Sequence, residues 1–129
     1  MATVCRAVEE CRRPGHRRPG VERHGLPYAS KAELAHKPGL LVGVSSGIGG
    51  AYPISELRAS SYKNCRLCYI PEHLIVRHAE QVLNDGAASN DDDQRLRPRI
   101  DYALDILNKY ALALQPVRAS IDLSQPAFA

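Results

Sequence analysis

The sequence is poor in large aromatic side chains and in long apolar runs. It has no tryptophan and only one phenylalanine in 129 residues, and six tyrosines supply nearly all of its aromatic surface. We therefore expect an aliphatic core of the size that one domain can bury, which excludes a two-domain enzyme. No run of about 18 apolar residues predicts a membrane span, and no apolar stretch follows Met1 as in a secretion signal. These absences favour a cytoplasmic protein.

Positive charge is concentrated at the beginning of the chain. Residues 1–23 hold six arginines against three glutamates, whereas the other 106 residues hold equal numbers of basic and acidic side chains. Arginine, proline and glycine cannot build a core, so we expect this segment to be a solvated, disordered tail. The alternative is an anchor for nucleic acid, because clustered arginines raise the local positive potential.

Four cysteines occur, and two of them, Cys65 and Cys68, have the spacing of a zinc-ligand pair. They lie in a strand-like run, however, where residues three apart point to opposite faces. We therefore predict free, buried thiols in a reducing cytosol and no metal site. Zinc binding or redox work is the alternative.

The middle of the chain alternates strand and helix patterns. Residues 40–44 (LLVGV) form the continuous apolar run of a strand that is covered on both faces. Residues 51–64 read as a helix with Pro53 in its first turn, and residues 65–71 read as a second strand that ends at Pro71. A crossover helix between two strands predicts a parallel pair, hence an α/β fold.

The flanking segments are less regular. Residues 28–36 predict a short helix that stops before Pro38, and residues 72–84 begin like a strand and end like a helix. An acidic loop leads to the strongest helical pattern, with Asp91–Asp93 at its start and its end before Pro116. One apolar stripe is predicted along this helix, made of Ile100, Ala103, Leu104, Leu107, Tyr110, Ala111 and Leu114.

A turn rich in serine and glycine, SSGIGG, joins the strand at 40–44 to the following helix. Glycines let a ligand approach the backbone, and the first N–H groups of a helix are unpaired donors. The structural alternative is a tight turn with no ligand. The turn resembles that of the short-chain dehydrogenases, but the Tyr28–Lys31 pair is misspaced and precedes the turn, and the chain is too short for that fold.

A longer stretch, residues 35–58 (AHKPGLLVGVSSGIGGAYPISELR), resembles the third flavin loop of the NAD(P)H-dependent FMN reductases, a flavodoxin-like family. The shared features are Lys37-Pro38 ahead of the strand, the turn itself, and the pair Leu57-Arg58 in the helix. The similarity continues through CYIPEHLIV, LNDG and the last helix, and covers about 90 of the 129 residues.

This resemblance implies a flavoprotein oxidoreductase with FMN as cofactor, NAD(P)H as co-substrate and a small-molecule electron acceptor. The flavin chemistry needs no acidic or basic side chain from the protein, so we name no catalytic residue. It implies a cofactor site at Ser45, Ser46, Gly47, Ile48, Gly49 and Gly50, with His24 and Pro27 as remnants of a second flavin loop.

Nothing before residue 38 resembles the family's phosphate-binding loop. We therefore expect a truncated relative: an irregular head over residues 1–38, the last two strands of a flavodoxin-like parallel sheet with flanking helices over 39–116, and an extended tail over 117–129. Flavin binding should then be weak, and the chain should self-associate through its sheet edge or its terminal helix. The alternative is a non-catalytic fragment that acts only as a dimerising interaction module.

Overall fold

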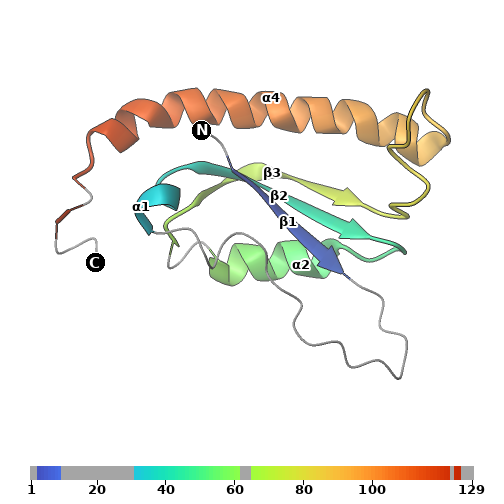
Figure 1. Ribbon diagram of the computed structural model, residues 1–129, viewed down its shortest axis with the longest axis horizontal. Helices are drawn as coiled ribbons and strands as arrows, with labels where there is room; N and C mark the ends of the chain where they lie inside the picture. The colour runs from blue at the N-terminus through green and yellow to red at the C-terminus, as the bar shows by residue number, and fades with distance from the viewer. Residues whose placement is uncertain (1–2, 10–30, 62–64, 123, 126–129) are drawn as a thin grey trace, which may run out of the picture.

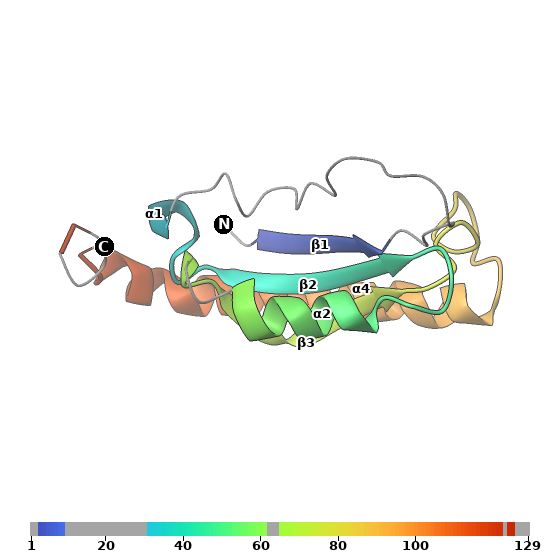
Figure 2. The ribbon, with the colours of Figure 1, turned by 90° about the horizontal axis from the view of Figure 1, so that it is seen from below.

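The computed structural model describes residues 3–9, 31–61, 65–122 and 124–125. Three parallel strands form one sheet in the order β1-β2-β3, with β1 at Thr3–Glu9, β2 at Pro38–Ser45 and β3 at Cys68–Val76. One helix lies on each face of the sheet, α2 (Ala51–Glu56) on one and α4 (Asp91–Ala119) on the other (Figures 1 and 2). The prediction of an α/β fold with a parallel sheet is confirmed.

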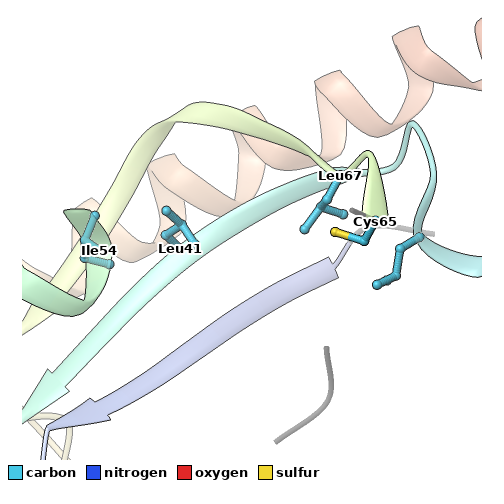
Figure 3. Packing of buried hydrophobic residues seen from close by; sticks show 5 residues of the cluster. Leu41, Ile54, Cys65 and Leu67 are labelled. Carbon is cyan, nitrogen blue, oxygen red and sulfur yellow. The ribbon is translucent and has the colours of Figure 1, made fainter. Parts of the chain in front are cut away.

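β2 is the central strand and is covered on both faces, as its apolar run predicted. Leu41 is fully buried on the side of α2, where it packs with Ile54, Cys65 and Leu67 (Figure 3). Leu40 is buried in the opposite core, with side chains of β3 and α4: Ile70, Leu74, Ala103 and Leu107. Adjacent residues of one strand therefore anchor two separate cores.

β1 corrects the expectation that residues 1–38 are irregular. Its seven residues pair in parallel with β2, from Thr3 opposite Gly39 to Glu9 opposite Ser45. Threonine and valine favour extended structure, but the intervening arginine and glutamate hide the strand in the sequence. The edge of β2 supplies the hydrogen-bonding partners that organise it. The short helix α1 (Lys31–Leu34) falls within the predicted 28–36.

β3 begins and ends later than predicted. It starts at Cys68 and continues past Pro71 to Val76, and no helix follows within residues 72–84. The register shifts between Gly39 and Leu41 of β2, whose partners are Tyr69 and His73, so Pro71 lies in a bulge of an edge strand. This is where a sheet tolerates proline, because no ladder hydrogen bond from its nitrogen is required.

The helix predicted over residues 51–64 is present over 51–61, and residues 62–64 lie outside the described residues. α2 covers six residues and passes into a π-helical stretch, η1 (Leu57–Ser61). Arg58 in η1 donates from Nη2 to three successive carbonyl oxygens of β3, those of Ile70, Pro71 and Glu72, at 3.1, 3.0 and 3.3 Å. The guanidinium thereby satisfies carbonyl groups around the bulge.

α4 is longer than predicted. Asn90 is its N-cap and accepts from the Asp93 N–H at 2.9 Å, and the helix continues through both Pro98 and Pro116 to Ala119. Residues 117–119, predicted as part of an extended tail, therefore belong to the helix. The predicted apolar stripe is only partly right, because Leu104 and Tyr110 are exposed and Ile106 packs against the core instead. No helix among the described residues is long and apolar enough to cross a membrane.

Candidate functional site

The carboxyl ends of the strands carry the candidate site. The glycine turn (residues 45–50) follows β2, the loop 77–90 follows β3, and the first turn of α4 lies beside that loop, at the right of Figure 1. In open parallel sheets ligands bind outside this edge.

Two glycines of this region are required by the backbone itself. A Cβ on Gly43 would lie 2.4 Å from the carbonyl oxygen of Gly50, far closer than atoms can approach. Gly50 has a φ of +96°, a left-handed conformation that side chains disfavour. These two glycines let the chain fold back tightly over the end of β2. At these two positions, glycine therefore has the purely structural role that was the alternative to ligand binding.

Gly47 has no such requirement. A Cβ built on it meets no described atom within 4 Å, and its φ does not lie in the left-handed region. The packing of the described residues therefore does not explain why this position is glycine. Its missing side chain leaves open space over the exposed side of the turn.

Hydrogen bonds orient the turn. Three of its carbonyl groups accept from the next loop: Ser45 from Ala79 N at 3.1 Å, Gly47 from His78 N at 3.1 Å, and Gly49 from Arg77 Nε at 3.4 Å. With the carbonyl groups fastened in this way, the N–H groups of Ser46, Ile48 and Gly49 donate to no other described residue. The turn thus presents backbone donors and few acceptors, which suits a ligand with carbonyl or ring-nitrogen acceptors.

The predicted site residues separate into two groups. Ser45 is buried, and its Oγ accepts from the Gly47 N–H at 3.2 Å, so this side chain fastens the turn instead of facing a ligand. Gly50 is buried as well. Ser46 and Ile48 are exposed, the latter with 79% of its surface accessible, and Gly47 and Gly49 lie between the extremes. His24 and Pro27 lie outside the described residues.

Two adjoining hollows lie beside the turn, with volumes of about 380 and 450 Å³. Both are lined by His78, Val82 and Asp92. The smaller one reaches the glycine turn at Ile48 and also contacts Arg77 and Arg95. Neither arginine was predicted as a site residue. The start of the helix was predicted, but the sequence has no pattern that places the loop 77–90 against it.

Asp93 holds the loop 77–90 in shape. Its carboxylate is completely buried and accepts from the backbone N–H groups of Leu83 and Ser89, each at 3.1 Å. The hydrogen bond from Arg97 is the main reason that the pKa of Asp93 is lowered to about 2, and the two backbone donors reinforce it. His78 and Leu83 both adopt positive φ values in this loop, which is costly for bulky side chains.

Cys65 and Cys68 belong to the opposite end of the sheet, ahead of and at the start of β3. Both are thiols; Cys65 is buried, and burial raises the pKa of Cys68. The prediction of free, buried thiols is confirmed for Cys65, whereas Cys68 is free but only partly buried. Within the described residues no cluster of His, Cys, Asp or Glu could hold a metal ion.

Comparison with known proteins adds no family to these observations. No protein-family model matches the chain, and no curated protein is significantly similar to it.

Proposed function

We propose that the glycine turn binds the ring edge of FMN and that the chain is a cytoplasmic oxidoreductase of the NAD(P)H-dependent FMN reductase type. The observation that carries this proposal is the set of backbone donors at Ser46, Ile48 and Gly49, which have no acceptor among the described residues. Gly47, in the same turn, packs against no described atom at its Cβ position. An isoalloxazine edge offers carbonyl and ring-nitrogen acceptors that match such donors.

The strand order also supports the proposal. A flavodoxin-like sheet has the order 2-1-3-4-5, so its third, fourth and fifth strands are neighbours in chain order and all parallel. β1, β2 and β3 have this arrangement, and the glycine turn follows the middle one of the three. The flavin-ring loop of the proposed family occupies the same place.

A bound FMN would supply hydride transfer from NAD(P)H and onward transfer of electrons to a small-molecule acceptor. The chain's own part is to hold the ring edge through backbone N–H groups. Arg58, which the family resemblance placed near the flavin loop, instead donates to carbonyl groups of β3 and is a structural residue.

The test is a fluorescence-quenching titration with FMN and with riboflavin, which has the same ring and no phosphate. Binding should be weak but saturable, and because the described site contacts only the ring, the two affinities should agree within about a factor of three. Gly47→Ala should leave the fold intact and weaken both affinities about tenfold or more, since its methyl group fills the space over the turn.

Ser46→Ala is the matched control, because it changes a side chain of the turn and keeps every backbone donor. It should bind both flavins like the wild type. Absence of saturable binding, or equal binding by the wild type and Gly47→Ala, would contradict the proposal.

We further propose that the chain pairs with a second copy through the outer edge of β1. The other edge of the sheet is unsuited to pairing, because it contains the bulge at Pro71 and Arg58 covers its carbonyl groups. β1 contains no proline, and no described strand pairs with its outer edge. Unpaired edges of this kind invite another strand.

Sedimentation analysis of two proline variants tests this pairing. N–H groups alternate in direction along a strand, so Arg6→Pro and Ala7→Pro remove one donor toward β2 and one toward the outside. One of the two variants should keep the fold and become monomeric. A monomeric wild type, or two folded dimeric variants, would contradict pairing through β1.

A further inference from the structure

The smaller hollow, of about 380 Å³, lies between the glycine turn, the end of β3 and the start of α4. Its apolar side chains come from four different segments: Ile48, Ile75, Val82 and Leu96. Val82 is buried, whereas Ile48 exposes 79% of its surface at the edge. A volume of this size is within the range of small-molecule sites.

Two arginines line the same hollow with unused donors. Arg95 makes no hydrogen bond or ion pair with any described residue, and Arg77 uses only its Nε, on the carbonyl of Gly49. Asp92 is the one carboxylate among the lining residues, and it forms no ion pair with either arginine. The hollow therefore has an excess of positive charge and several guanidinium N–H groups directed to no described acceptor.

Hydrogen bonds hold the loop segment that lines this hollow. Asp93 holds the Leu83 N–H, and the loop carbonyl of Asn84 accepts from Arg97 Nη2 at 2.8 Å, so the segment that carries Val82 is tied to α4. The N–H groups of His78 and Ala79 tie the beginning of the same segment to the glycine turn. A site held in this way loses little conformational entropy on binding.

We propose that this hollow binds a flat aromatic molecule with one carboxylate group. The ring would cover Ile48, Val82 and Leu96, and the carboxylate would accept from Arg77 and Arg95, whose planar guanidinium groups match its geometry. This site uses side chains, whereas the proposed flavin site uses backbone N–H groups of the turn, so it needs no flavin. Its boundary at Ile48 places a bound ring next to any ligand of the turn.

The experiment is a titration of the flavin-free protein with 2-naphthoate and with its neutral counterpart 2-naphthamide, followed by ligand-detected NMR. The two probes share a ring and differ in charge. We expect 2-naphthoate to bind about tenfold more tightly than the amide. Arg77→Gln and Arg95→Gln should each remove about a factor of three to ten of that preference, and Ile48→Ser should weaken both probes.

Arg118→Gln is the control, because it makes the same change near the far end of α4. It should leave both affinities unchanged. The proposal is overturned if neither probe binds, if the amide binds as tightly as the acid, or if Arg118→Gln loses as much affinity as the pocket variants. Circular dichroism of each variant separates loss of the site from loss of the fold. None of these outcomes depends on whether FMN binds.

Discussion

Arg97 and Asp93 are joined by two hydrogen bonds one helical turn apart, from Nε to Oδ1 at 2.9 Å and from Nη2 to Oδ2 at 3.1 Å. The same Nη2 also donates to the carbonyl of Asn84. A fork of this kind holds both partners in one geometry, which a lysine could not do. This ion pair connects α4 to the loop 77–90, which lines the candidate site.

We predict that Asp93 makes the fold acid-sensitive. Its pKa is lowered from 3.8 to about 2, so the folded state holds its proton less tightly than the unfolded state does. The contribution of this carboxylate to stability is therefore complete above about pH 4 and is lost as the pH falls toward about 2. Urea unfolding over this range should show a falling free energy of unfolding.

Asp93→Asn provides the comparison for this acid titration. The amide keeps the side-chain shape but has no charge for Arg97, so the variant should be less stable near neutral pH and should lack this part of the acid loss. Its unfolding free energy should approach that of the wild type at the acid end. If the two proteins keep a constant difference throughout, Asp93 is not the titrating group.

Arg58→Met should destabilise the fold by about 1–3 kcal/mol, because it leaves carbonyl groups of Ile70, Pro71 and Glu72 without their donor while keeping most of the side-chain volume. Equilibrium urea unfolding measures this cost. Arg118→Met, whose side chain has no comparable set of acceptors, should change stability much less. Equal effects in the two variants would show that Arg58 does not support the bulge.

The central part of the fold could be predicted because its residues agree with their local structure. The apolar run around Leu40 and Leu41 indicated a strand covered on both faces, and Pro53 was acceptable in the first turn of the helix that follows. The predicted end of α4 was wrong, because Pro116 was expected to terminate the helix. The helix continues past Pro116 to Ala119, as it also does through Pro98, although proline supplies no backbone N–H to the helix.

The parts that could not be predicted depend on partners distant in sequence. β1 forms by pairing with the edge of β2, and its own residues show no pattern that predicts a strand. The loop 77–90 has no periodic pattern, and its shape depends on the buried Asp93, which reads as one of three equivalent acidic residues. The sequence therefore did not indicate that Arg77 and Arg95 line the same hollow.

Asn90→Ala should cost about 1 kcal/mol, because the Asn90 side chain accepts from the Asp93 N–H at the start of α4. Its Nδ2 also donates to the carbonyl of Gln81 at 2.9 Å, so the loop should loosen together with the helix end. Thermal unfolding and amide exchange of loop residues measure both effects. Asn108→Ala, in the exposed middle of α4, should be neutral or slightly stabilising, and a comparable loss there would contradict a capping role.

The two cores on either side of β2 should respond separately to truncation. Leu40→Ala and Leu41→Ala each remove a buried side chain and should each destabilise the protein by about 2–5 kcal/mol in urea unfolding. Leu40 packs with α4 and Leu41 with α2, so amide exchange should accelerate mainly in α4 for the first variant and mainly in α2 for the second.

Leu112→Ala is the control for both core variants, because Leu112 lies on α4 with 57% of its surface exposed and should cost little. If Leu40→Ala and Leu41→Ala accelerate exchange equally in both helices, the two cores unfold as one unit. Damage to the α4 face would then also release the glycine turn from its place at the end of β2. If the effects stay separate, the turn depends on the α2 core alone, and Leu41→Ala should weaken any ligand of the turn more than Leu40→Ala does.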